Sequence, residues 1–157
     1  MLWFIIPALI LAADQTIKHF VETMIAFGEK VPVIEDFFYI TYHTNTGAAH
    51  GILQNGNFIF IPVTIIAVIV IVYFILKRKE KFLKAVLAVL LGGALGNLTD
   101  RIFKGAVTDY LDFYFGSYHY ATFNIADSCI FISAVLLVIY ILFVYKESGE
   151  KKDALKK

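Results

Sequence analysis

The sequence is poor in cysteine and in charge. Cysteine occurs once among the 157 residues, at Cys129, which excludes an internal disulfide framework and a cysteine-rich metal site. Charged residues make up only 17% of the chain, whereas hydrophobic residues make up 59% and the mean hydropathy is +0.74. Ordinary water-soluble domains hold nearer half apolar residues. The composition therefore favours a membrane protein, and the length suits one domain.

Several catalytic motifs are also absent. The sequence contains no H-E-x-x-H, no G-x-S-x-G and no phosphate-binding loop. The four histidines are scattered without ligand spacing, at His19, His43, His50 and His119. No histidine lies near Cys129 in sequence to activate it, so we interpret this cysteine as a small packing residue. These absences disfavour zinc-peptidase, serine-hydrolase and nucleotide chemistry.

Four long apolar segments account for most of the hydrophobic residues. They run over about 2–24, 58–76, 82–98 and 125–145, and each approaches the roughly 20 residues that cross a hydrocarbon core. Inside lipid such segments are helical, because every backbone polar group needs a partner within the chain. We therefore predict a membrane α-helical fold, a four-transmembrane-helix bundle that forms one domain over 1–146, with a polar tail at 147–157. A cleaved signal peptide is disfavoured for the first segment, because no basic region precedes it.

Basic residues sort to one side of this predicted bundle. The link over 77–84 carries five of them in eight residues, and the tail beyond Tyr145 carries five lysines. The connections over about 25–57 and 99–124 carry only Lys30, Arg101 and Lys104. The positive-inside rule then places both termini and the 77–84 link in the cytoplasm, and the other two loops outside.

The two predicted outer loops differ in composition. The first contains the β-prone runs V-P-V-I and F-F-Y-I-T-Y-H, which predict a small extracytoplasmic β-sheet on this loop, lying on the membrane surface. The second contains the aromatic run Y-L-D-F-Y-F-G-S-Y-H-Y at 110–120. Such a run is typical of an interfacial anchor, and it also fits a lid over a lipid-facing groove.

Charges at membrane depth are informative, because each costs several kcal/mol unless it is paired or solvated. Asp14 and Lys18 are four residues apart and share one helix face, either as a structural ion pair or as part of an active site. A second group combines the close-contact pattern of Gly92 and Gly96 with a polar cluster at the outer helix end. This cluster comprises Asn97, Asp100 and Arg101, and packing explains it better than catalysis does.

Asp109 and Asp127 form the third group. Asp109 lies just beyond the third apolar segment and Asp127 lies at the start of the fourth, so both fall at the same outer level of the membrane. Asp112 and Asp100 are competitors at a similar depth. Helix capping by Asn124 explains why Asp127 is tolerated in a first helical turn, but it does not explain Asp109.

Two carboxylates held a few ångströms apart cannot both ionise comfortably, so they share a proton. Such a pair supplies a general base and a general acid at one pH, as activation of water against an amide requires. The helix N-terminus favours the charged form of Asp127, so we expect Asp109 to hold the proton. We also expect the two carboxyl groups to lie within roughly 3–6 Å of each other.

Five motifs in order resemble the lipoprotein signal peptidase family, also called signal peptidase II. The matching residues are Asp14-Gln15-x-x-Lys18, Asn45-Thr46-Gly47-Ala48-Ala49, Gly96-Asn97-x-x-Asp100-Arg101, Val107-Thr108-Asp109-Tyr110 and Phe123-Asn124-Ile125-Ala126-Asp127-Ser128. Each motif is weak alone, but five in order, covering nearly the whole chain, are specific.

The resemblance implies a membrane aspartyl peptidase that needs no metal or organic cofactor. It implies cleavage of bacterial prolipoproteins just before a cysteine that carries diacylglycerol, with Asp109 and Asp127 as the catalytic pair. Supporting or substrate-binding positions are implied at Asp14, Lys18, Asn45, Gly47, Asn97, Asp100, Arg101, Asn124 and Ala126. The expected location is the bacterial cytoplasmic membrane, with the active site toward the extracytoplasmic face. We expect membrane lipid and lipid-modified prolipoproteins as partners, no nucleic acid, and function as a monomer.

Some positions depart from the family pattern. They are Thr44, His50, Thr108, Tyr110 and Cys129, and none is one of the paired aspartates. Two other functions fit a polar-lined bundle: a small ion or solute transporter subunit with an intramembrane Asp/Lys path, or a structural scaffold. Transporters typically show repeat symmetry or broken helices that meet at mid-membrane. This chain instead gathers its polar residues toward one side and has no internal repeat.

Overall fold

The computed structural model describes residues 2–47 and 53–145. Its elements follow in chain order: a 3₁₀ turn at Leu2–Phe4, α1 (Ile5–Met24), β1 (Lys30–Ile34), β2 (Phe38–Asn45), α2 (Asn57–Lys77), α3 (Lys81–Phe103), β3 (Val107–Phe115), β4 (Tyr118–Phe123), α4 (Ile125–Ile139) and a π-helical turn at Tyr140–Tyr145. Four helices of the described part are long and apolar enough to cross a membrane, which confirms the predicted fold class. The third of them runs to Phe103, beyond its expected end at 98.

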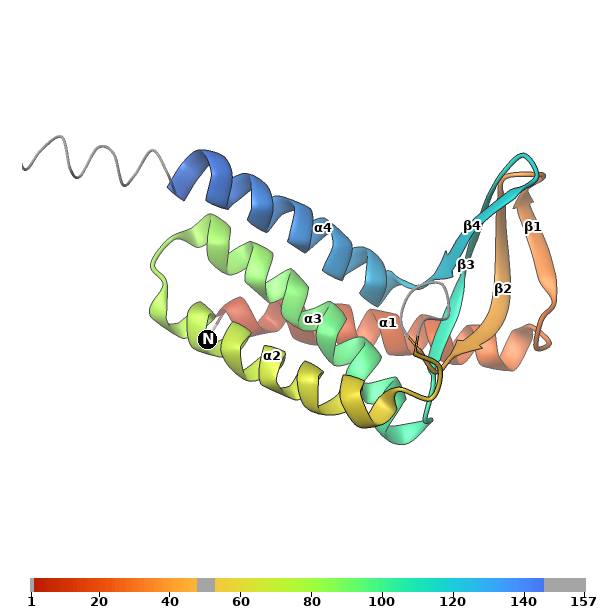
Figure 1. Cartoon of the computed structure of the whole chain (residues 1–157), viewed down its shortest axis with the longest axis horizontal. Helices are drawn as coiled ribbons and strands as arrows, with labels where there is room; N and C mark the ends of the chain where they lie inside the picture. The colour runs from red at the N-terminus through yellow and green to blue at the C-terminus, as the bar shows by residue number, and fades with distance from the viewer. Residues whose placement is uncertain (1, 48–52, 146–157) are drawn as a thin grey trace, which may run out of the picture.

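The helices lie lengthwise beside one another, with the sheet at one end of the bundle (Figure 1). That end receives the last turns of α1 and α3 and the first turns of α2 and α4. The chain start and the link between α2 and α3 lie at the opposite end. The basic link over 77–84 and the sheet are therefore at opposite ends of the bundle, as the charge pattern predicts.

Helix α3 forms the centre of the bundle and packs against α1, α2 and α4. Its glycines permit the close approach that the Gly92/Gly96 spacing predicts. A Cβ added at Gly92 would lie 2.8 Å from Ile10 Cβ on α1, and one added at Gly93 would lie 2.5 Å from the carbonyl oxygen of Ala126 on α4. Because these contacts involve backbone or backbone-proximal atoms, only a residue without a side chain fits there.

The sheet has four antiparallel strands in the order β1-β2-β3-β4. Its first two strands come from the first outer loop, as expected. The second outer loop supplies β3 and β4, so the aromatic run at 110–120 forms half of the sheet. The sheet is therefore shared by both outer loops, and this sharing brings Asp109 into register with His43.

Candidate active site

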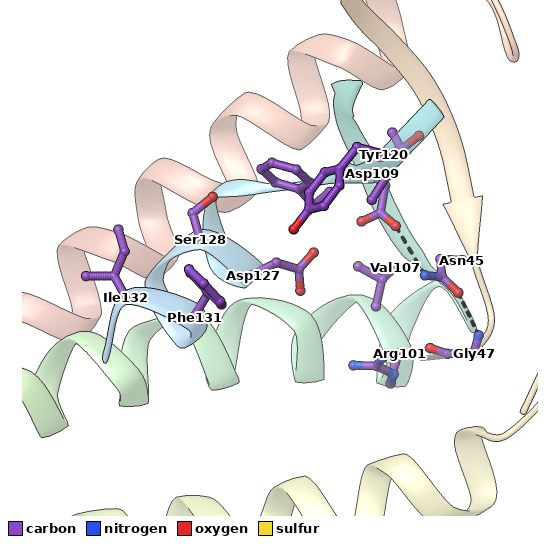
Figure 2. Close-up of a pocket in the computed structure, with 13 residues that line it drawn as sticks. Asn45, Gly47, Arg101, Val107, Asp109, Tyr120, Asp127, Ser128, Phe131 and Ile132 are labelled. Carbon is purple, nitrogen blue, oxygen red and sulfur yellow. Dashed lines mark hydrogen bonds between the residues drawn. The ribbon is translucent and has the colours of Figure 1, made fainter. Parts of the chain in front are cut away.

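A cavity of about 460 Å³ lies where β2, β3 and β4 meet α3 and α4. It is lined by Asn45, Gly47, Arg101, Val107, Asp109, Tyr120, Ala121, Thr122, Phe123, Asp127, Ser128, Phe131 and Ile132. Figure 2 shows the carboxyl groups of Asp109 and Asp127 both directed into this cavity. Asp109 and Asp127, which the sequence predicts to lie at the same membrane depth, thus line the same cavity.

Asp109 reaches the cavity from the first half of β3. Its side chain is 3% exposed and accepts two hydrogen bonds from amides, one from Asn124 Nδ2 at 2.8 Å and one from Asn45 Nδ2 at 3.3 Å. Burial raises the pKa of Asp109 to about 7, and the nearby charge of Asp127 adds to this increase. Asp109 is therefore mostly protonated below about pH 7.

Asp127 is fixed by the start of α4. Asn124 is the N-cap of this helix: its side chain accepts from the backbone N–H of Asp127 at 2.9 Å, and Asp127 Oδ2 accepts from the Asn124 backbone N–H at 3.3 Å. This reciprocal capping box sets the side-chain direction. Asn97 Nδ2 donates to Asp127 Oδ1 at 2.6 Å. Donors on both oxygens and the positive end of the helix dipole favour the carboxylate form.

Asn124 connects the two aspartates. Its side-chain amide donates to Asp109, while its backbone N–H donates to Asp127. The same amide lies 3.3 Å from Asn97 Oδ1, and Asn124 is fully buried. The two carboxyl groups therefore share one rigid, hydrogen-bonded support.

Behind this support lies a buried ion cluster. Lys18 Nζ lies 2.8 Å from Asp14 Oδ2 and 2.8 Å from Asp100 Oδ2, and all three side chains are fully buried. Lys18 also donates to Asn97 Oδ1 at 3.2 Å, which orients the amide that binds Asp127. Asp14 Oδ1 accepts from the backbone N–H of Ala126 at 3.1 Å. The cluster joins α1, α3 and α4 and positions the site without lining the cavity.

Arg101 occupies the cavity wall. Its Nη2 donates to the carbonyl of Gly47 at 3.2 Å, and its guanidinium lies 5.1 Å from the centre of the Phe60 ring. The backbone N–H of Gly47 donates in turn to Asn45 Oδ1 at 2.8 Å, whose amide binds Asp109. These contacts attach the end of β2 to α3 beside the pair. Ala48, Ala49 and the departure at His50 lie outside the described residues, as does the tail at 147–157.

Asp112, the competing carboxylate, faces away from Asp109. It accepts from Thr122 Oγ1 at 2.9 Å, contacts His119 Nε2 at 2.6 Å and pairs with Lys30 Nζ at 3.3 Å. Burial opposes ionisation of Asp112, but these hydrogen bonds outweigh it and lower its pKa. Both oxygens of Asp112 therefore have partners, and the residue lies outside the Asp109–Asp127 pair. Among the described residues, no group of three or more His, Cys, Asp or Glu side chains is arranged to hold a metal ion.

Comparison with known proteins identifies the family. A family model described as signal peptidase (SPase) II matches residues 6–143. The lipoprotein signal peptidase of Bacillus pumilus (strain SAFR-032) is 42% identical over 152 residues, which cover 96% of this chain and 98% of that protein. The chain belongs to the signal peptidase II family. It is thus a membrane-embedded peptidase of aspartic type, and the transporter and scaffold alternatives are not favoured.

Solved structures of a bacterial membrane enzyme agree with this signal peptidase II assignment. One, determined by the in meso method at 2.3 Å, is 36% identical with a TM-score of 0.85, and the match covers 95% of this chain and 90% of that one. Another, determined at 1.9 Å, is 36% identical with a TM-score of 0.81, covering 90% and 93%. The likeness extends over the four helices and the sheet together.

The sequence motifs located the polar side of the site but only part of its apolar wall. Tyr120, Phe123, Phe131 and Ile132 line the cavity opposite the aspartates. Phe123 stands in a family motif and Tyr120 in the aromatic run at 110–120. Phe131 and Ile132 gave no signal beyond proximity to Asp127, since aromatic and aliphatic residues are common throughout the chain.

Proposed function

We propose that Asp109 and Asp127 are the catalytic pair of a peptidase that removes signal peptides from prolipoproteins. The observation that carries this proposal is that both carboxyl groups line one cavity and receive hydrogen bonds from the same residue, Asn124. The substrate class follows from the relative in Bacillus pumilus, which is a lipoprotein signal peptidase.

The two aspartates divide the acid and base roles. Asp127, whose two oxygens both accept hydrogen bonds, takes a proton from water, and the water oxygen attacks the scissile carbonyl carbon. Asp109, which is mostly protonated below its pKa of about 7, gives its proton to the carbonyl oxygen. A tetrahedral gem-diol results, with Asp109 now ionised and Asp127 protonated.

Collapse of this intermediate restores the pair. The C–N bond breaks, Asp127 gives its proton to the leaving amine, and one hydroxyl of the gem-diol returns a proton to Asp109 as the carbonyl forms again. Asn45, Asn97 and Asn124 hold the carboxyl groups through both steps. The buried ion cluster acts indirectly, because it orients Asn97 and the first turn of α4. Its members are Lys18, Asp14 and Asp100.

The substrate reaches the pair sideways from lipid. Phe131 and Ile132 line the cavity and are 68% and 54% exposed on the outer surface of α4, so the hollow continues onto the lipid-facing side of the bundle. A precursor that carries diacylglycerol on its cysteine already lies in the membrane, with its scissile amide near the outer interface.

The basic link over 77–84 faces the cytoplasm, as do both termini, and the sheet faces outward.

Substitution of each aspartate tests the proposal. Asp109→Asn and Asp127→Asn should each abolish turnover, because either change removes one member of the acid–base pair. The assay follows the size shift of a lipid-modified precursor after reconstitution of the full chain into liposomes. Asp112→Asn is the matched control and should retain activity, since an asparagine oxygen still accepts from His119 and Thr122. Activity in Asp109→Asn together with its loss in Asp112→Asn would assign catalysis to the other carboxylate.

A further inference from the structure

Strand β4 contains a bulge beside the active site. The pairing of β3 with β4 runs from Leu111 opposite Phe123 to Phe113 opposite Ala121, and then moves to Tyr114 opposite His119. Tyr120 is therefore an extra residue, without a partner of its own on β3. Bulges turn local side chains to new directions and are frequent next to active sites.

The bulge changes which side chains share a face. In a regular strand His119 and Thr122, three residues apart, would point to opposite faces of the sheet. Here both reach the same carboxyl oxygen, Asp112 Oδ1, at 2.6 and 2.9 Å. Asp112 is 1% exposed, so these contacts are shielded from bulk water. Asp112 thus binds β4 on both sides of the bulge and stabilises the extra residue between them.

Two neighbours extend this contact on the same face. Lys30 pairs with Asp112 Oδ2 at 3.3 Å, hydrogen-bonds Tyr114 and lies 4.6 Å from the centre of its ring. The rings of Tyr114 and His119 are 4.7 Å apart. The group therefore fixes β1, β3 and β4 to one another, on the face of the sheet opposite Asp109.

Tyr120, the extra residue of the bulge, points to the face of the sheet that carries Asp109. Tyr120 lines the cavity together with Asp109 and Asp127, and Figure 2 shows its ring extending from β4 over the space between the two carboxyl groups. The ring packs edge-on against Phe115 at 5.9 Å, and the residue is still 47% exposed. It therefore has a free surface that faces the place where a scissile peptide would lie.

We propose that Tyr120 is a substrate-contacting residue whose ring packs against the peptide segment at the cleavage site, and that Asp112, His119 and Thr122 are positioning residues that hold it there through the bulge. This inference rests on the proposed function, since it takes the cavity as the peptide-binding site. The ring makes the contact, so its hydroxyl is dispensable. The contribution is to substrate affinity and not to proton transfer.

Kinetics of three tyrosine variants test the contact. With the full chain in liposomes and a diacylglyceryl-modified prolipoprotein, Tyr120→Ala should raise KM about tenfold with kcat within about twofold, because a buried aromatic contact is lost. Tyr120→Phe should keep both constants. Tyr118→Ala is the matched control, since Tyr118 lies on the same strand, is 61% exposed and is outside the cavity. An unchanged KM in Tyr120→Ala, or an equal rise in Tyr118→Ala, would overturn the proposal. A loss of kcat in Tyr120→Phe would also overturn it.

Variants of the opposite face test the positioning. Asp112→Ala should reproduce the KM rise of Tyr120→Ala, and the double variant should be no worse than either single variant, because both changes remove the same contact. Asp112→Asn should restore KM, since it keeps the accepting oxygen. Additive effects in the double variant would show that Asp112 does not act through Tyr120. If Asp112→Ala does not fold, His119→Phe provides the same comparison, because it removes a contact to Asp112 at a residue outside the cavity.

The two proposals fail in different ways. If Asp109→Asn and Asp127→Asn remain active, the catalytic assignment is wrong whatever happens at Tyr120. If they are inactive and Tyr120→Ala keeps the wild-type KM, the catalytic pair stands and the role of the bulge is wrong.

Discussion

At the residue scale, the proposed role of Asp109 as the acid predicts the pH range of the enzyme. Its carboxyl group must be protonated to act as an acid, and burial raises its pKa to about 7. We expect kcat/KM to fall about tenfold for each pH unit above that value, as for a single required proton. A pH–rate profile of the reconstituted protein measures this, and a flat profile from pH 6 to 9 would contradict the acid role.

The same pKa makes a prediction for stability. The folded protein binds a proton at Asp109 more tightly than the unfolded chain, whose pKa is near 3.8, so ionisation of this group costs stability as the pH rises from about 4 to 7. Asp109→Asn should therefore raise the Tm at pH 8 and change it little at pH 4. Thermal unfolding in detergent at the two pH values provides the measurement.

Lys18 is expected to matter more for folding than for chemistry. Removing its charge in Lys18→Met leaves Asp14 and Asp100 buried without their shared cation, a type of change that costs about 3–5 kcal/mol. Lys104→Met is the control. Its side chain is 35% exposed and pairs with Glu22 and Asp100, so the expected loss is at most about 1 kcal/mol. Equal Tm values for the two variants would contradict the structural role of Lys18.

Predictions about single residues succeeded for charged side chains at membrane depth, because burying a charge there costs free energy unless it is paired. An aspartate or lysine at membrane depth is informative, and the structure gathers Asp14, Lys18 and Asp100 into one cluster. The roles of Asp109 and Asp127 as a catalytic pair, and their separation of a few ångströms, remain predictions. Tyr120 was included in the aromatic run at 110–120, which fits an anchor or a lid, but nothing singled it out, because the bulge that redirects it depends on pairing between strands.

At the element scale, the contact between α3 and α4 places Asp127. A Cβ at Gly93 would lie 2.5 Å from the carbonyl oxygen of Ala126, which is backbone and cannot move aside as a side chain could. Gly93→Ala should therefore push α4 away, lowering both Tm and kcat. Val89→Ala, at a half-buried position on the same helix, should leave kcat unchanged. Wild-type kcat in Gly93→Ala would show that the site tolerates a shift of α4.

Elements differed in how well the sequence predicted them. The four membrane helices follow from long, largely apolar runs, and α2 at Asn57–Lys77 was predicted to within a residue at each end. Strands β3 and β4 were not predicted, because the aromatic residues at 110–120 fall on both faces and the bulge interrupts the two-residue alternation. The pairing of β3 with β2 connects segments more than 60 residues apart, which local patterns do not reveal.

At the scale of the whole molecule, the proposed opening of the cavity toward lipid beside α4 predicts that lipid on the substrate drives binding. A precursor with diacylglycerol on its cysteine should be cleaved far faster than the same precursor without it, because buried acyl chains contribute about 0.8 kcal/mol per methylene. The experiment compares the two forms at equal concentration in liposomes. Equal rates would contradict access from lipid and would favour a general signal-peptide hydrolase.

The bond between Asp14 on α1 and the backbone of Ala126 on α4 joins the first and last membrane helices. It has a consequence for biosynthesis. A ribosome delivers α1 more than a hundred residues before α4, and Asp127 arrives only with that final helix. Until then the growing chain holds Asp109 without its partner and leaves Asp14 without one of its donors. On the proposed catalytic pair, activity therefore begins only with the insertion of α4.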